Sequence, residues 1–150
     1  MREILFRGKA KAIAGCPYNN GKPDGEWVFG YVFSDLGAMK IRQYETDRPE
    51  CNDYEVDPET VGQYTGLTDK NGVRIFEGDI CRFKRFNDVY VGKIVFNTKT
   101  ASFIMCYNSI VGVYGEKATH KMLLSVCDNI EVIGNIHDNP ELLKGGEDNG

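Results

Sequence analysis

The feature that most constrains this chain is a series of short runs of β-branched and aromatic residues, separated by glycines and almost free of helical periodicity. The 17 glycines fall between or inside these runs. Such punctuation is typical of many short strands joined by tight turns. The sequence therefore predicts a mostly β protein. We expect strands at 3–7, 26–33, 39–44, 60–64, 73–76, 79–86, 89–96, 101–107, 121–127 and 130–136.

Turn chemistry supports the breaks between these strands. Asn87 and Asp88 stand between two alternating runs and predict a two-residue hairpin loop. Residues 57–60 combine a capping acid, a proline and a further acid, which predicts a short helical turn, and 139–143 follow the same logic with Asn139 as the capping residue. Asp79 follows a glycine at the start of a strand and is expected to accept hydrogen bonds from nearby backbone amides.

An acidic stretch at 45–59 interrupts the strands and suggests a boundary between two parts. We predict an N-terminal β unit at 1–52, a C-terminal barrel at 53–144 and a disordered tail at 145–150. The alternating acids of the stretch lie on one face of an extended backbone, as a site for a hard cation requires, but the spacing of a calcium loop is missing. A solvated connecting loop is the preferred interpretation. These acids are Asp53, Glu55, Asp57 and Glu59.

Composition excludes several classes of protein. The 150 residues carry a formal net charge of −4, which argues against a protein that coats nucleic acid through bulk charge. No run approaches the ~20 apolar residues of a membrane span, and the N-terminus lacks the pattern of a secretory signal. The five cysteines contain no C-x-x-C pair, so we interpret them as small hydrophobes in a reducing cytoplasm.

No catalytic constellation is recognisable. The chain has two histidines, His120 and His137, and neither accompanies a G-x-S-x-G or H-E-x-x-H motif. Phosphate-binding motifs of the G-x-x-x-x-G-K-[ST] and G-x-G-x-x-G types are also missing. We therefore expect no enzyme, no metal site and no cofactor.

One segment has the composition of a nucleic-acid site. Residues 73–107 hold six Lys and Arg against three Asp and Glu, a local charge of +3. Basic residues interleaved with aromatics bind single strands, because the cations follow phosphates and the rings stack on bases. Phe83 and Phe86 fall on opposite faces of an ideal strand, so a solvated barrel rim is the preferred alternative. The candidate residues are Arg82, Lys84, Arg85, Phe86, Tyr90, Lys93 and Lys99.

Four blocks carry a family resemblance, in one order along the chain. They are Phe6-Arg7-Gly8-Lys9, Gly25-Glu26-Trp27-Val28-Phe29-Gly30, the segment 56–80 with its Gly62-Gln63-Tyr64-Thr65-Gly66 core, and Glu131-Val132-Ile133-Gly134-Asn135-Ile136 with the turn that follows. Together they resemble the YopX family of bacteriophages and prophages. The resemblance implies an SH3-like β-barrel in the C-terminal part and a phage origin. It implies no catalytic residues.

These observations favour a small phage or prophage accessory protein that acts as a non-enzymatic binding module in the cytoplasm of the bacterial host. The expected partner is a host or phage macromolecule rather than a membrane. A protein partner, bound by strand addition to an open sheet edge, is preferred. The alternative is a single-stranded nucleic acid bound by the basic and aromatic strand at 82–93. Short strands leave edges that can also pair between copies, so a homo-oligomer stays open.

Overall fold

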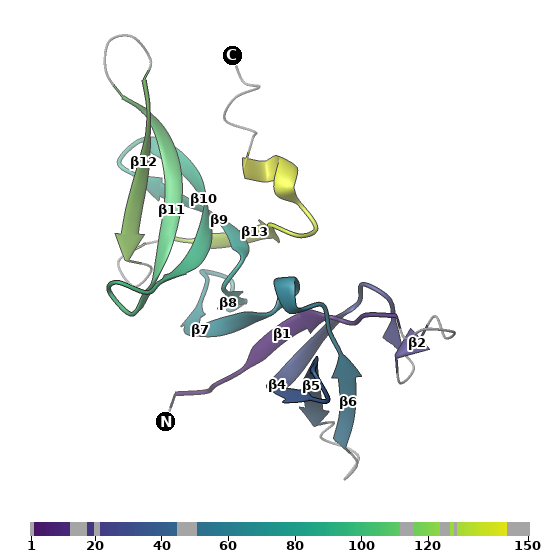
Figure 1. Ribbon diagram of the computed structural model, residues 1–150. Helices are drawn as coiled ribbons and strands as arrows, with labels where there is room; N and C mark the ends of the chain where they lie inside the picture. The colour runs from purple at the N-terminus through teal and green to yellow at the C-terminus, as the bar shows by residue number, and fades with distance from the viewer. Residues whose placement is uncertain are drawn as a thin grey trace. The chain divides into compact units, whose positions relative to one another are not determined.

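The computed structural model describes residues 2–12, 18–19, 22–44, 51–111, 116–123, 127 and 129–143. It consists of two compact units, Met1–Tyr64 and Thr65–Gly150. Strands dominate both units, and two short 3₁₀ turns supply the helical content of the described residues (Figure 1). The prediction of a mostly β protein is confirmed. Cys16, most of the loop at 14–24, residues 45–50 and the tail at 145–150 lie outside the described residues.

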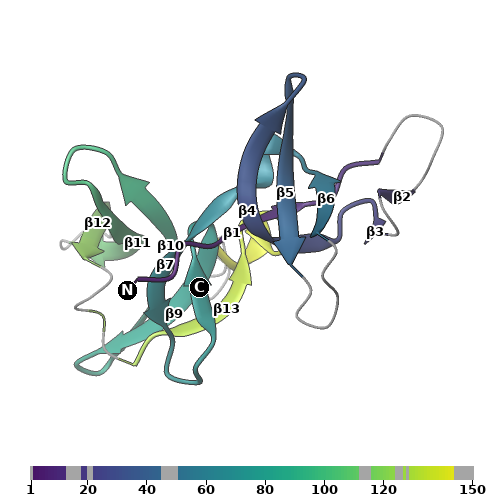
Figure 2. The ribbon, with the colours of Figure 1, turned by 90° about the horizontal axis from the view of Figure 1, so that it is seen from below.

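The first unit holds the strands β6, β5, β4 and β1 of an antiparallel sheet, neighbours in that order, with the start of β7 (Gly62–Thr68) beside β1. Its centre is the long hairpin of β4 (Trp27–Asp35) and β5 (Ala38–Tyr44), which is seen from below in Figure 2. The edge strand β6 (Cys51–Glu55) pairs with β5, and β1 (Phe6–Lys9) pairs with the first half of β4. β2 (Tyr18–Asn19) and β3 (Lys22–Pro23) form a separate small ladder.

One face of this sheet builds the core of the first unit. Val28, Ile41 and Tyr54 point to it from three adjacent strands, and Ala10 and Val56 complete it. Each of the larger side chains contributes about 1.5–3 kcal/mol through burial. Gly8 also faces this core, where a Cβ would approach atoms of Ile41, Val56 and Val61 to 3.2 Å. The opposite face of β4 and β5 is therefore the one that carries the charged side chains.

The second unit holds a five-stranded antiparallel sheet with the order β12-β11-β10-β9-β13. Its strands are β9 (Asp79–Arg85), β10 (Asp88–Asn97), β11 (Ser102–Val111), β12 (Glu116–Leu123) and β13 (Glu131–Asn135). The first four form a meander, and β13 returns to pair with β9. Within the described residues no ladder joins β12 to β13, so the sheet does not close into a barrel there.

A second core lies on the face of this sheet that Cys81, Phe83 and Ile94 share with Met105 and Tyr107. Gly92 lies on the same face, opposite Tyr107 and Cys81. The rings of Phe83, Tyr90 and Tyr107 contact one another with centroids 5.0–5.3 Å apart. Aromatic pairs at this separation add to the stabilisation that burial alone gives.

Buried aspartates organise the turns before β9. Asp69 follows β7 (Gly62–Thr68), and its carboxylate accepts hydrogen bonds from the backbone N–H groups of Asn71 at 2.8 Å, Val73 at 2.9 Å and Val132 at 3.0 Å. Asp79 accepts from the N–H of Phe76, the last residue of β8 (Arg74–Phe76), at 2.7 Å. The expectation that Asp79 anchors its turn through backbone amides is confirmed.

The first predicted helical turn is also confirmed. It is η1 (Pro58–Thr60), with Asp57 as the N-cap that accepts from the N–H of Glu59 at 3.1 Å. The second appears as η3 (Pro140–Leu143). Proline at the first helical position favours both starts, with Asp57 before it in η1 and Asn139 before it in η3.

The acidic stretch is not a loop throughout, and this corrects the sequence interpretation. Its residues 51–55 form β6, where Tyr54 is buried in the core while Asp53 and Glu55 lie opposite Arg42 and Lys40 of β5. Cross-strand charge pairing offsets the low strand propensity of the acids. The boundary predicted after residue 52 falls inside this strand, whereas the compact units divide after Tyr64.

The hairpin loop between β9 and β10 lies one residue earlier than predicted. Arg85 pairs with Asp88, so the loop residues are Phe86 and Asn87. Phe86 adopts a φ of 56°, in the left-handed region that β-hairpin loops of two residues require. As a result the Phe86 ring is 90% exposed at the tip of the hairpin.

Candidate binding surfaces

The basic and aromatic residues predicted at 82–93 are separated onto different sides of the second unit. Arg82 and Lys84 point away from the core, while Phe83 between them is only 2% exposed. Tyr90 pairs with Phe83 and stacks on it. Lys93 pairs with Ile80 and Cys106, on the outer face that Arg82 occupies. The cations and the rings of these two strands therefore face opposite directions.

The other three predicted residues, Arg85, Phe86 and Lys99, lie at or beside the turns at the two ends of β10. Arg85 and Phe86 are at the tip, with the Arg85 guanidinium carbon 5.7 Å from the centre of the Phe86 ring. Lys99 lies in the turn that connects β10 to β11, at the other end of β10. The structure does not bring the seven candidate residues together into one surface.

Arg82 is engaged by a carboxylate of the neighbouring strand. Its Nη2 donates to Oε2 of Glu131 on β13 at 2.5 Å, and the Lys70 Nζ lies 3.5 Å from the same oxygen. The hydrogen bond from Arg82 lowers the pKa of Glu131, with the positive charge of Lys70 acting in the same direction. Lys84 and Lys93 form no ion pair among the described residues, and no aromatic ring lies beside them on this face of β9 and β10.

A different surface, which sequence reasoning missed, combines rings with cations on one face. Alternate residues of β4 turn away from the core of the first unit, and these are Trp27, Phe29, Tyr31 and Phe33. Val28 and Val32 face the core instead. Phe29 is 42% exposed and Tyr31 is 54% exposed, while Trp27 and Phe33 are half-buried. We call this row of four rings the β4 aromatic row.

Cations flank the β4 aromatic row on both sides. On β1, Lys9 pairs with Trp27 and Arg7 pairs with Phe29. On β5, Arg42 pairs with Tyr31 and Lys40 pairs with Phe33. Directly paired residues of antiparallel strands share a face, so the register alone places these four cations beside the rings.

Two of the cations on β1 contact the tryptophan. The guanidinium carbon of Arg7 lies 4.7 Å from the centre of the Trp27 ring, and the Lys9 Nζ lies 5.4 Å from it. Both distances are within the range of cation–π attraction. Arg7 is only 8% exposed, so its role at this surface is to hold Trp27, whereas Lys9 is half-buried and closer to solvent.

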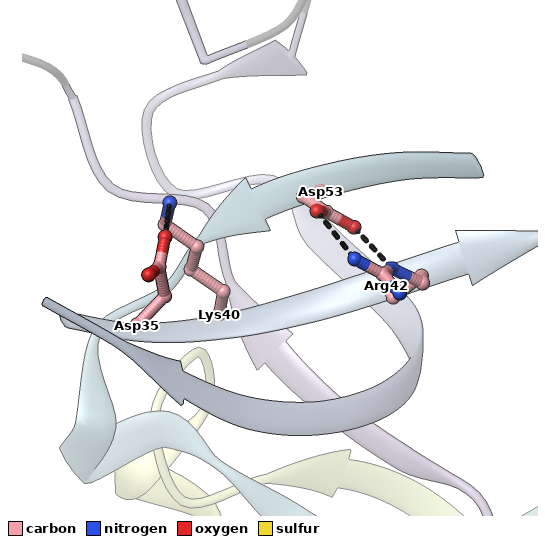
Figure 3. A network of polar contacts seen from close by, with 4 residues as sticks. All are labelled: Asp35, Lys40, Arg42 and Asp53. Carbon is pink, nitrogen blue, oxygen red and sulfur yellow. Dashed lines mark hydrogen bonds and ion pairs between the residues drawn. The ribbon is translucent and has the colours of Figure 1, made fainter. Parts of the chain in front are cut away.

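The two cations on β5 form a polar network with acids of β4 and β6 (Figure 3). Arg42 donates to both carboxylate oxygens of Asp53, from Nε at 2.7 Å and from Nη2 at 3.0 Å, and its guanidinium carbon lies 5.0 Å from the centre of the Phe33 ring. The Lys40 Nζ donates to Asp35 at 2.9 Å. The hydrogen bond from Arg42 lowers the pKa of Asp53, and the hydrogen bond to Asp35 raises the pKa of Lys40.

The network gives the alternating acids a role that neither sequence interpretation named. Asp53 faces Arg42 and Glu55 pairs with Lys40, while Asp57 caps η1. Within the described residues, no group of three or more His, Cys, Asp and Glu side chains is arranged to hold a metal ion. The alternation of acids on β6 matches the alternation of cations on β5.

The two histidines lie at separate places in the second unit. His120 is on β12, where its ring stacks on Tyr107 with centroids 5.2 Å apart. His137 follows β13, and its Nε2 lies 3.8 Å from the position of a Cβ at Gly78. In the part of the chain that the structure describes, no helix has the length and apolar character of a membrane span.

A sequence signal for the β4 aromatic row exists. The run Trp27-Val28-Phe29-Gly30-Tyr31-Val32-Phe33 places an aromatic residue at every second position. Because side chains alternate between the faces of a strand, this spacing puts all four rings on one side. The strand was predicted from this run, but the face of it that is exposed was not.

Known proteins resemble this chain over most of its length. The family model described as YopX protein matches residues 31–144. Among solved structures, the chain is similar to protein EF1440 from Enterococcus faecalis, with 23% sequence identity, a TM-score of 0.44, and coverage of 95% of this chain and 99% of that one. No curated protein matches the chain. The match spans the two later sequence blocks, at 56–80 and from Glu131 onward, and more than half of the chain, so the chain belongs to the YopX family.

Proposed function

We propose that this protein is a non-enzymatic binding module, and that its principal binding surface is the β4 aromatic row with the cations beside it. The observation that carries the proposal is the exposure of Phe29 and Tyr31, at 42% and 54%, in the middle of a sheet face. Single exposed apolar side chains are ordinary on protein surfaces. Adjacent exposed rings with charged neighbours are instead typical of interaction sites, where aromatic residues and arginine are enriched.

Affinity capture from a bacterial lysate tests this proposal. The full chain, the double variant Phe29→Ala/Tyr31→Ala and the control variant Leu36→Ala are immobilised in parallel. Leu36 is a fully exposed apolar residue in the β4–β5 turn, so its loss removes apolar surface outside the row. We expect the wild type and Leu36→Ala to retain the same macromolecule, and the double variant to lose it. Equal retention by all three proteins would contradict the proposal.

A second candidate function is the addition of a strand from a partner protein to the edge of the second unit. The observation in its favour is that β12 ends the strand order of the five-stranded sheet. Edge strands of this kind bind extended peptides through main-chain hydrogen bonds. A proline in place of Thr119, near the middle of β12, would abolish such binding without touching the first unit.

The proposal extends to the origin and fold that family resemblance implies. We also propose a phage or prophage origin and a cytoplasmic location in the bacterial host. Phage genes flanking the coding sequence would support that origin. We also include an SH3-like barrel for the second unit. A meander of four strands whose fifth strand returns to the first supports that fold. Nuclear Overhauser contacts between β12 and β13 in solution would test whether the barrel closes.

A further inference from the structure

We infer that the outer face of the five-stranded sheet in the second unit binds the phosphate backbone of a nucleic-acid duplex through Lys84, Lys93 and Lys121. We call these three residues and the sheet surface between them the lysine face. The lysine face is separate from the β4 aromatic row, so the inference goes beyond the proposed function. Lys121 belongs to β12, which lies outside the segment 73–107 that composition singles out.

The register of the sheet puts the three lysines on one side. Lys93 of β10 pairs with Cys106 of β11, and Cys106 pairs with Lys121 of β12. On its other side Lys93 pairs with Ile80 of β9, and Lys84 follows Ile80 on β9 by an even number of residues. Paired residues of antiparallel strands share a face, as do alternate residues of one strand. All three lysines are exposed, as this face of the sheet requires.

Acids do not neutralise the lysine face. Among the described strand residues, Glu131 of β13 is the one acid on this side of the sheet, and Arg82 and Lys70 both engage it. The three lysines form no ion pair within the described residues, either with Glu131 or with Glu141 of η3, which packs against β10. This face therefore keeps a positive charge in a chain whose formal net charge is −4, and binding responds to the local field.

The spacing of the lysines requires an extended ligand. Neighbouring strands lie about 4.7–4.9 Å apart, so the backbones at Lys93 and Lys121, with β11 between them, are about 10 Å apart. Lys84 pairs with Val89, four residues before Lys93 on β10, which adds about 13 Å along the strand. One phosphate ion cannot reach all three ammonium groups. A duplex carries a negative charge for every ~1.7 Å of its axis, so it can place a separate phosphate beside each lysine.

The chemistry of the lysine face favours a duplex over a single strand or a protein. Phe83, Tyr90 and Tyr107 pack on the opposite side of the sheet, so the bases of a single strand would find none of these rings to stack on. A duplex has the higher charge density, which gives it the advantage where phosphates alone are bound. Protein interfaces are depleted in lysine and enriched in aromatic residues and arginine, the reverse of what this face presents.

Fluorescence anisotropy with the full chain and a short fluorescein-labelled DNA duplex tests the inference. Each phosphate contact contributes about −0.9 to the slope of log affinity against log salt, so three lysines predict a slope of about −2.7. Raising the salt concentration from about 50 to about 200 mM should then weaken wild-type binding by about 40-fold. The double variant Lys93→Gln/Lys121→Gln should reduce the slope to about −0.9 and weaken binding at the lower salt concentration by about tenfold or more.

Matched controls separate the lysine face from bulk charge and from other ligands. Lys11→Gln/Lys22→Gln removes the same charge from the first unit and should keep the wild-type slope. Phe86→Ala removes the exposed ring at the tip of the β9–β10 hairpin and should bind the duplex like the wild type, because the face binds phosphates alone. A single strand of equal length should bind no more tightly than the duplex. Circular dichroism confirms that each variant is folded.

Several outcomes overturn the inference. They are no binding of the duplex at the lower salt concentration, a wild-type slope in Lys93→Gln/Lys121→Gln, equal losses in that variant and in Lys11→Gln/Lys22→Gln, and tighter binding of the single strand. Binding to phosphatidylserine vesicles that Phe86→Ala abolishes, without binding of the duplex, would assign this part of the second unit to a membrane surface instead. The β4 aromatic row is tested by its own variants in the first unit, so either idea can fail while the other stands.

Discussion

The two units use the same residue types, basic and aromatic, to opposite effect. In the first unit the rings of β4 and the cations of β1 and β5 occupy one face, and Phe29 and Tyr31 are exposed between the charges. In the second unit Arg82 and Lys84 face outward while Phe83 and Tyr90 pack inward. The comparison shows that composition identifies the chemistry of a segment, whereas strand parity decides whether that chemistry shares a surface.

Replacing one ring in each unit should give the largest difference between the units in the free energy of unfolding. Phe83→Ala removes a buried ring and should lower the free energy of unfolding by about 3–5 kcal/mol. Phe29→Ala removes an exposed ring and should change it by less than about 1 kcal/mol. Denaturant unfolding followed by far-ultraviolet circular dichroism measures both. A cost for Phe83→Ala as small as that for Phe29→Ala would show that the second core is not built as described.

In each unit a glycine lets two strands approach closely, and alanine at that position should destabilise both units to a similar extent. A Cβ at Gly30 would overlap the carbonyl oxygen of Arg42, and a Cβ at Gly92 would overlap that of Cys106. In each case the overlapping atom belongs to the main chain and cannot move alone, so Gly30→Ala and Gly92→Ala should each cost about 1–3 kcal/mol or more. Thermal unfolding checks this, with Gly37→Ala as a comparison that carries backbone strain but no overlap, since Gly37 has a φ of 81° and open space around its Cβ. Unchanged midpoints for Gly30→Ala and Gly92→Ala would contradict the tight packing.

The buried carboxylate of Asp69 should make the stability of the second unit depend on pH under acid conditions. Burial opposes the charge of Asp69 most strongly, yet hydrogen bonds from Val132, Val73 and Asn71 outweigh it, so its pKa is lowered. A lowered folded-state pKa gives stability that is complete above the unfolded value of about 3.9 and is lost as pH falls through the folded value. Asp69→Asn should therefore cost about 2 kcal/mol at neutral pH and flatten the decline below about pH 4. An unchanged acid profile would contradict this role of Asp69.

The smallest effect should come from the exposed pair of the first unit. A double-mutant cycle of Arg42→Gln and Asp53→Asn should give a coupling energy of about 0.2–1 kcal/mol, because solvent screens both side chains. Raising the salt concentration should reduce it further. The pKa of Asp53 is also lowered, so its share of stability is likewise lost below about pH 4. A coupling as large as the effect of Asp69→Asn would mean that this network is structural rather than superficial.

Much of the strand pattern could be predicted, and the failures have definite causes. Turn and cap chemistry is local, so Asp57 before Pro58 predicts η1 and Asp79 predicts its amide contact. The strand at 51–55 could not be found this way, because its acids favour loops until β5 places Arg42 and Lys40 opposite them. The division after Tyr64 likewise depends on pairing between β1 and the start of β7, which are distant in sequence.

The binding surfaces show the same division. The run from Trp27 to Phe33 already determines that four rings share one side of a strand, because side chains alternate with a period of two. The sequence by itself also determined the mostly β character of the chain and its membership of the YopX family. Which side of each strand is buried, and which cations stand beside the rings, was decided only by the tertiary structure. The physical reason is that register is set between strands, so a shift of one residue would exchange the two faces without changing a single local preference.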